Sequence, residues 1–237
     1  MTKNLFDTVK SMEFAAENYL TPLKQAFQKN RHPEKAYQME KYMRFKFPYY
    51  GIQQPLRKEI WKAFKQSNPL PESRWLNDVV KKLWEYQERE YQMVALDVLF
   101  ESRKTWKKDQ IQLLEQLIVD KSWWDTVDML ASNLVGYYFQ MFPSETYKFT
   151  GQWNESENVW LNRSSILFQL KYKDATDFEL LKKYILNHTE TDEFFIQKAI
   201  GWSLREYAKT DARKVLRFVD ENSLPALSRR EALKNIK

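Results

Sequence analysis

The segment EFFIQKAIGWSLREYAKT, residues 193–210, sets one tryptophan among several cations. We expect a helix over residues 192–209 whose core stripe recurs at the helical period: Ile196, Ile200, Leu204 and Tyr207. The opposite side of this helix carries Lys198, Trp202, Arg205 and Lys209. Cations beside an indole ring suit contacts to a phosphate backbone and to the neighbouring sugar or base. The alternative is a cation–π cluster on a solvated face.

The segment KSWWDTVD, residues 121–128, pairs another tryptophan with a carboxylate. In a helix that begins near Ser122, the predicted core stripe consists of Trp123, Val127, Leu130, Leu134, Tyr137 and Met141. At about 100° per residue, Trp124 and Asp128 lie one turn apart on a flank of this helix. The pair is a candidate functional site; the alternative is that Trp124 packs on a neighbouring helix and Asp128 is merely solvated. We also expect Ser122 to be the N-cap, with Asp125 completing a capping box.

Several kinds of chemistry are excluded by the residues that are missing. The absence of cysteine excludes disulfides, thiolate nucleophiles and thiolate metal sites. The two histidines, His32 and His188, lie in predicted loops far apart in the sequence, so no zinc or iron–sulfur site is expected. There is no glycine-rich phosphate loop, dinucleotide fingerprint or nucleophile elbow. If the protein is an enzyme, it is expected to work without a metal or a nucleotide cofactor.

The composition predicts an all-α fold. The 237 residues are 43% apolar and 16% aromatic, which is enough to build a core. Four glycines and eight prolines are too few turn residues for a sandwich, a barrel or a doubly wound sheet. Lys and Arg number 38 against 32 Asp and Glu, and the net charge of +6 permits a polyanionic partner without requiring one.

A repeat organises the helices. A shift of 35 residues aligns REYQMVALDVL (89–99), WDTVDMLASNL (124–134), VWLNRSSILFQ (159–169) and FFIQKAIGWSL (194–204). This period predicts stacked helix pairs in a HEAT-like solenoid, an α-α superhelix. Equivalent positions of successive repeats line one side of such a solenoid: Lys58, Met93, Asp128, Arg163 and Lys198. If this row faces the concave side, it forms a cationic groove that can hold a rod-like anion.

The segment VWLNRSSILFQLKYK, residues 159–173, is apolar nearly all round and predicts a central helix. Arg163 interrupts the side that carries Val159, Ile166 and Leu170. An unpaired buried charge is very costly, so Arg163 needs an anionic partner. Asp128, one repeat earlier in the same row, is the candidate within the protein, and a phosphate group is the other candidate.

Three of these segments, KSWWDTVD, NVWLNRSSILFQLKYK and EFFIQKAIGWSLREYAKT, resemble the signature segments of the AlkD family of bacterial DNA alkylation-repair glycosylases. The resemblance continues through KYMRF, GIQQP and WEYQEREYQ to LSRREALKNI. It implies a HEAT-like solenoid that holds duplex DNA in a concave groove and hydrolyses the N-glycosidic bond of N3- or N7-alkylated purines. It also implies action without a base-flipping pocket. The first twenty residues are not covered, and we expect an additional N-terminal helix over residues 1–20.

The resemblance also implies roles for individual residues. Asp128 would be the catalytic carboxylate, and Trp124 and Trp202 would form the walls around the deoxyribose of the lesion. The residues expected to bind DNA are Arg163, Tyr42, Gln53, Lys171, Arg205 and Lys198. An alkylated purine already carries positive charge, so the remaining task is to stabilise the oxocarbenium character of the sugar and to orient water, which a carboxylate can do. No lysine Schiff base is required, so strand cleavage is not expected.

No low-complexity linker divides the chain, and we expect a single domain over residues 1–237. The first twenty residues carry Asp7, Glu13 and Glu17, so neither an export signal nor a membrane anchor is expected. We expect a cytoplasmic monomer whose partner is double-stranded DNA containing alkylated purines. The alternative function is a non-catalytic HEAT-like module that binds nucleic acid or protein.

Overall fold

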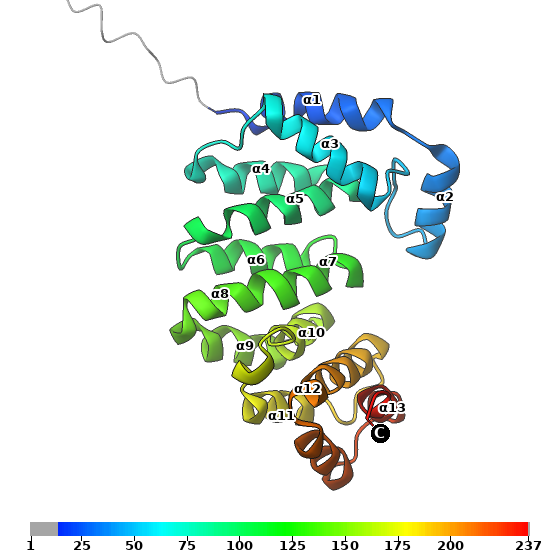
Figure 1. Ribbon diagram of the computed structural model, residues 1–237, viewed down its shortest axis with the longest axis vertical. Coiled ribbons are helices and arrows are strands. Elements are labelled where there is room, and N and C mark those ends of the chain that lie inside the picture. Colours follow the sequence, from blue (N-terminus) through cyan, green and yellow to red (C-terminus); the bar gives the residue numbers. More distant parts are fainter. Residues whose placement is uncertain (1–13, 237) are drawn as a thin grey trace, which may run out of the picture. The chain divides into compact units, whose positions relative to one another are not determined.

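The computed structural model describes residues 14–236, and every regular element within this range is helical (Figure 1). The prediction of an all-α fold is therefore confirmed. The chain divides into two compact units, residues 1–99 and 100–237. Most of the predicted additional helix over residues 1–20 lies outside the described residues, and the first described helix begins at Ala16. The single domain and its concave groove stay predictions.

The first unit contains α1 (Ala16–Lys29), α2 (Pro33–Tyr42), α3 (Gln54–Ser67), α4 (Ser73–Glu85) and most of α5 (Arg89–Ser102). A buried carboxylate shapes the aromatic loop between α2 and α3. Glu90 accepts hydrogen bonds from the backbone N–H groups of Tyr50 at 3.1 Å and of Gly51 and Ile52 at 3.0 Å each. Gly51 has a φ of +87°, and a Cβ there would lie 2.2 Å from the carbonyl oxygen of His32, so only glycine fits.

The second unit contains the helices that follow α5. They are α6 (Gln110–Val119), α7 (Trp124–Met129), the π-helical segment η2 (Leu130–Val135), α8 (Gly136–Met141), α9 (Thr146–Asn154), α10 (Val159–Leu167), α11 (Phe178–Leu186), α12 (Phe194–Glu221) and α13 (Ala226–Leu233). Three short 3-10 turns, η1 (Arg103–Thr105), η3 (Pro143–Glu145) and η4 (Lys173–Ala175), connect them. The helix predicted over residues 192–209 continues beyond that range, because α12 kinks at Asp211 and resumes.

The predicted 35-residue period is confirmed by where helices begin. α3, α5, α7, α10 and α12 begin at Gln54, Arg89, Trp124, Val159 and Phe194, each 35 residues after the one before. Helices in the same register therefore carry their side chains in the same phase. A repeated helix pair, in which each unit buries its apolar face on the next, accounts for this regularity.

The predicted central position of α10 is also confirmed. All seven residues from Leu161 to Leu167 are buried, and the helix contacts α6, α7, η2, α9, α11 and α12. Asn158 starts the helix as its N-cap, since its side-chain oxygen accepts from the N–H groups of Trp160 at 2.9 Å and Leu161 at 3.3 Å. Arg163 is thus held by a helix that is packed among other helices of its unit.

Two expectations about the helix after Ser122 are wrong. The helix begins at Trp124 with Trp123 as its N-cap, and the Ser122 hydroxyl instead donates to the carbonyl oxygen of Ile118 at 2.7 Å, so there is no capping box. The core stripe is followed through Leu134 but then shifts, because Tyr138 is fully buried while Tyr137 is half-buried. The π-helical turn η2 explains the shift, since a π turn holds more residues than an α turn and rotates the following side chains.

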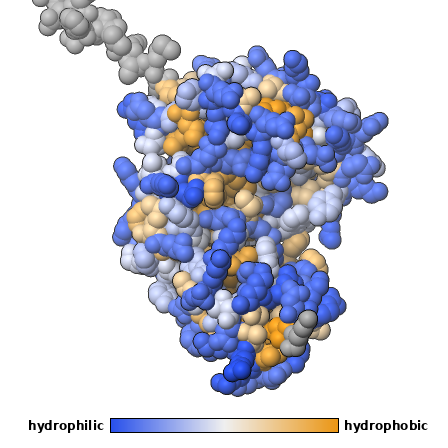
Figure 2. All heavy atoms as spheres, in the orientation of Figure 1, coloured by the Kyte–Doolittle hydropathy of each residue, from blue (hydrophilic) through white to orange (hydrophobic). Residues whose placement is uncertain are grey.

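No helix in the described part of the chain is long and apolar enough to cross a bilayer. Most of the face seen in Figure 2 is covered by hydrophilic side chains, with smaller hydrophobic areas between them.

Candidate functional site

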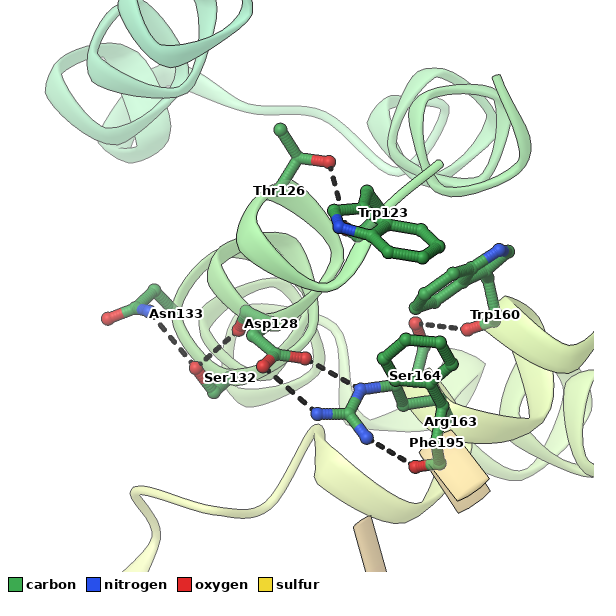
Figure 3. Close-up of polar contacts among 9 residues, drawn as sticks. All are labelled: Trp123, Thr126, Asp128, Ser132, Asn133, Trp160, Arg163, Ser164 and Phe195. Atoms are coloured by element: carbon green, nitrogen blue, oxygen red, sulfur yellow. Dashed lines mark hydrogen bonds and ion pairs between the residues drawn. The ribbon is translucent and has the colours of Figure 1, made fainter. Parts of the chain in front are cut away.

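Asp128 and Arg163 form a bidentate ion pair in the second unit (Figure 3). Arg163 Nε lies 2.7 Å from Asp128 Oδ1, and Arg163 Nη2 lies 3.0 Å from Oδ2. The pair joins α7 to α10, which are neighbours in the repeat. The Arg163 side chain is 5% exposed and the Asp128 side chain 18%. The expectation that Asp128 is the protein partner of the buried arginine is confirmed, and the Asp128 side chain is still partly exposed.

A third helix completes the surroundings of Arg163. Its Nη1 donates to the backbone carbonyl oxygen of Phe195 in α12, and its guanidinium carbon lies 5.9 Å from the Phe195 ring centroid. That ring packs with Trp123 and Trp160, and the three centroids lie 4.9 to 5.7 Å apart. Arg163 is therefore satisfied within the protein. Of the two partners expected for it, the geometry favours the carboxylate, and a contact from Arg163 to DNA stays a prediction.

The charge of Asp128 is set by two opposing influences. Burial raises the pKa of Asp128 above its ordinary value, and the nearby carboxylate of Asp125 adds a smaller increase. The hydrogen bonds and the positive charge of Arg163 lower the pKa in opposition. Bidentate arginine–carboxylate bonds are among the strongest in proteins, so we infer that Asp128 is ionised at neutral pH.

The two adjacent tryptophans separate as expected. Trp123 is 9% exposed and belongs to the aromatic group behind Arg163. Trp124 is the first residue of α7 and is half-buried, one turn before the half-buried Asp128. The flank of α7 therefore presents an indole and a carboxylate side by side.

A series of hydrogen bonds connects Lys171 to the turn that carries Asp128. The Lys171 ammonium donates to the side-chain oxygen of Asn133. Asn133 Nδ2 donates to Ser132 Oγ at 3.0 Å, and Ser132 Oγ donates to the backbone oxygen of Asp128 at 2.6 Å (Figure 3). Ser132 and Asn133 belong to the π-helical segment η2, a type of distortion often found at functional sites. The exposed Lys171 is thus linked to the backbone of Asp128 through Asn133 and Ser132.

The cationic face of α12 differs from the sequence interpretation. Glu231 of α13 reaches two of its cations, with Oε1 lying 3.2 Å from Lys198 Nζ and Oε2 lying 2.5 Å from Arg205 Nη1. Lys209 lies 2.6 Å from Glu206 on the same helix. Each cation expected on this face has a carboxylate partner, so the face is less positive than its sequence indicates. The core stripe of α12 is confirmed, since its four residues are all buried.

Of the other residues predicted for the site or the repeat row, Trp202 lies in the second unit, and Tyr42, Gln53, Lys58 and Met93 lie in the first. Trp202 is half-buried on α12, which packs on α10. In the first unit, Tyr42 is 73% exposed at the end of α2, and the exposed Gln53 is the N-cap of α3. Lys58 is exposed and Met93 half-buried in that unit. The structure brings Asp128 and Arg163 into direct contact and links Lys171 to them through Asn133 and Ser132. The positions of Tyr42, Gln53, Lys58 and Met93 are described within the first unit alone.

Three contributors to the site are missed by the sequence analysis: Trp160, Phe195 and Glu231. The repeat register carries a signal for two of them, because Trp160 and Phe195 are 35 residues apart and are the second residues of α10 and α12. Glu231 carries no such signal, since it lies in α13, beyond the last repeat. Within the described residues, no group of three or more His, Asp and Glu side chains could hold a metal ion.

Comparisons with known proteins identify the family of the chain. The sequence profile of the DNA alkylation repair enzyme family matches residues 23–236. A solved structure described as a "predicted DNA alkylation repair enzyme from Enterococcus faecalis" has a TM-score of 0.81 to this chain and 33% sequence identity, and the match covers 87% of this chain and 97% of that one. A search of curated proteins finds no match. Because the family profile spans nearly all of the described residues, the chain belongs to the family of DNA alkylation repair enzymes.

Proposed function

We propose that this protein is a monofunctional DNA glycosylase that hydrolyses the N-glycosidic bond of N3- and N7-alkylated purines in duplex DNA. The observation that carries the proposal is the Asp128 carboxylate, which is partly exposed and fixed by a buried arginine. Membership of a family of alkylation repair enzymes suggests alkylated bases as the substrate class. Purines alkylated at N3 or N7 carry a positive charge. A fixed carboxylate beside an indole is suited to the cationic sugar that forms when such a base departs.

The reaction uses few groups of the protein. The bond between the sugar C1′ and the base nitrogen breaks, and its electron pair neutralises the alkylated base, so the base needs no protonation. Positive charge develops on the sugar, where the Asp128 carboxylate and the Trp124 and Trp202 rings stabilise it. Water then bonds to C1′ and loses a proton to the carboxylate or to solvent. Arg163 contributes by fixing the plane of the carboxylate and by keeping it ionised.

Each Asp128 oxygen still has acceptor capacity after the Arg163 bonds are formed. A carboxylate oxygen carries two lone pairs, and Arg163 occupies one on each oxygen. The second pair of each oxygen can face the sugar or a water molecule. In this proposal Arg163 is a positioning residue, while Tyr42, Gln53, Lys171, Lys198 and Arg205 contact the DNA.

Recognition is proposed to occur without a base-flipping pocket. A cavity of about 310 Å³ in the second unit lies against α10, η4 and α12, lined by residues that include Gln169, Lys173 and Tyr207. Neither Asp128 nor the two tryptophans line it. This cavity therefore does not serve as a pocket for the target base in the proposed reaction.

The central experiment compares two matched variants. Asp128→Asn keeps the shape of the side chain but removes its charge, and we expect release of 7-methylguanine from methylated DNA to fall about 10²-fold or more, the scale of a lost electrostatic group. Asp97→Asn is the control, because Asp97 pairs at 2.5 Å with the buried Arg57 in the first unit and is 25% exposed. Both variants disrupt a similar arginine–carboxylate pair.

The outcomes separate catalysis from folding. We expect Asp97→Asn to release base at nearly the wild-type rate per folded molecule, and Asp128→Asn to retain DNA binding. Unchanged base release by Asp128→Asn would remove Asp128 from the mechanism. One observation favours the alternative of a non-catalytic binding module: Arg163 engages both oxygens of Asp128, as in a purely structural pair. That alternative is supported if the wild-type protein binds methylated DNA without releasing 3-methyladenine or 7-methylguanine.

A further inference from the structure

α13 is docked tightly on α12 (Figure 1). Gly201 permits the close approach, since a Cβ there would lie 2.5 Å from Glu231 Cβ and 3.0 Å from the carbonyl oxygen of Ser228. The buried Ser228 hydroxyl donates to the carbonyl oxygen of Gln197 at 2.9 Å. These contacts fix Glu231 over α12, so its position is determined by helix packing.

Glu231 acts as an anion bound between two cations. Its two oxygens face Lys198 Nζ at 3.2 Å and Arg205 Nη1 at 2.5 Å. The Glu231 side chain is 13% exposed, whereas Lys198 is 37% and Arg205 23% exposed. The hydrogen bond from Arg205, with that from Lys198, lowers the pKa of Glu231 below its ordinary value, so the carboxylate stays charged.

This arrangement matches what a DNA phosphate requires. A phosphodiester carries one negative charge on two outward oxygens, as a carboxylate does, and Lys and Arg bind both groups through the same N–H donors. The two cations lie on one face of α12, two turns apart, with Trp202 between them in the sequence. Both cations are exposed enough for a second anion to approach.

We propose that Lys198 and Arg205 form a binding site for one DNA phosphodiester and that Glu231 occupies this site until DNA displaces it. The inference rests on the proposed function, because it assumes that α12 faces DNA. Glu231 then weakens binding to all DNA, since each encounter must separate it from its cations. Its effect also depends on salt, because both the internal pair and the DNA contact are ionic.

The test measures binding of undamaged duplex DNA by fluorescence anisotropy at several KCl concentrations between about 50 and 200 mM. Glu231→Gln removes the competing charge and keeps the size of the side chain. Glu179→Gln is the control, because it makes the same charge change in the same unit, at an exposed pair in which Glu179 lies 2.7 Å from Lys182 on α11. A general effect of net charge would appear equally in both variants.

We expect Glu231→Gln to bind DNA about tenfold more tightly than Glu179→Gln at the lowest salt. Its salt slope should be steeper by about one, because in Glu179→Gln the displaced Glu231 carboxylate takes up a counterion while the phosphate contact releases one. Equal affinity and slope in the two variants would overturn the proposal and leave Glu231 as a purely structural link. If Glu231→Gln does not fold, Lys198→Gln provides the test. Loss of this cation should weaken DNA binding and lower the slope relative to wild type, and an unchanged affinity and slope would overturn the proposal.

The result is distinguishable from failure of the proposed function. If the wild-type protein releases 7-methylguanine but Glu231→Gln binds DNA as Glu179→Gln does, only the phosphate site is refuted. If the wild-type protein binds DNA with the expected Glu231 effect but releases no base, the phosphate site stands and the glycosylase is refuted. Absence of any DNA binding refutes both.

Discussion

Removal of the Arg163 side chain should destabilise the protein by a predictable amount. Arg163→Met keeps much of the apolar stem but leaves the Asp128 carboxylate without its two charged donors and the carbonyl of Phe195 without its donor. Loss of one partner from a buried ion pair typically costs about 3–5 kcal/mol. Because Asp128 is 18% exposed and water can reach it, we expect the lower end, a loss of about 3 kcal/mol in the free energy of unfolding.

The loss in the free energy of unfolding of Arg163→Met should be smaller in acid than at neutral pH. Burial already raises the pKa of Asp128, and without Arg163 the opposing influence disappears, so the pKa rises further. A carboxyl group whose pKa is raised in the folded state favours folding below its unfolded pKa, and this contribution is lost as the pH rises through the folded pKa. The stability deficit of Arg163→Met relative to wild type should therefore be largest at neutral pH and shrink in acid.

Urea denaturation at neutral and acidic pH measures both effects. Arg57→Met is the matched control, because it opens the comparable pair with Asp97 in the first unit. The double variant Arg163→Met/Asp128→Asn should be more stable than Arg163→Met alone, since no uncompensated charge remains. A deficit at neutral pH below about 1 kcal/mol, the value for an exposed ion pair, would show that the pair is not buried in solution. If the stability difference between Arg163→Met and wild type stays constant with pH, the Asp128 carboxylate is not its cause.

The remaining predictions concern packing and the pH dependence of the reaction. Gly136→Ala should lower the free energy of unfolding by about 1–3 kcal/mol, because its Cβ would lie 2.4 Å from the carbonyl oxygen of Phe168. Gly151→Ala, in α9, should instead leave the free energy of unfolding unchanged or raise it by up to about 1 kcal/mol, since its Cβ would meet only the Tyr184 hydroxyl at 3.9 Å. Urea denaturation of both variants measures the difference. Base release in single turnovers should fall in acid with an apparent pKa above the ordinary aspartate value, because burial raises the pKa of Asp128 and only its ionised form stabilises the sugar. A rate that stays constant down to the ordinary aspartate pKa would contradict the assignment.

The sequence predicts those features of the fold that depend on buried residues recurring at a regular spacing. The starts of α7, α10 and α12 follow from the 35-residue register, because each helix must bury the same face on its neighbour. The need of Arg163 for an anionic partner follows from the cost of an unpaired buried charge, and the register makes Asp128 the candidate within the protein. Both arguments use only the spacing of residues along the chain, and the structure bears both out.

The features that were missed depend on departures from that regularity. The π-helical turn after Asp128 shifts burial from Tyr137 to Tyr138, and no residue in the turn, such as a proline, marks it in the sequence. The contact of Glu231 with Lys198 joins α13 to α12 across 33 positions in a helix outside the repeat. Such a contact is set by how α13 docks, which local periodicity does not encode.

In the proposed reaction, the placement of Arg163 in α10 lets the Asp128 carboxylate meet two conflicting requirements. A catalytic carboxylate is most effective where water is largely excluded, but the same exclusion raises its pKa and favours the neutral form. Arg163 opposes that rise, and its own burial is tolerated because α7 and α12 satisfy all three of its bonding nitrogens. Since α10 is enclosed by helices on several sides, the guanidinium has little freedom to follow a displaced Asp128. A substitution inside α10 that touches no DNA should therefore still alter the reaction, through the position of Arg163.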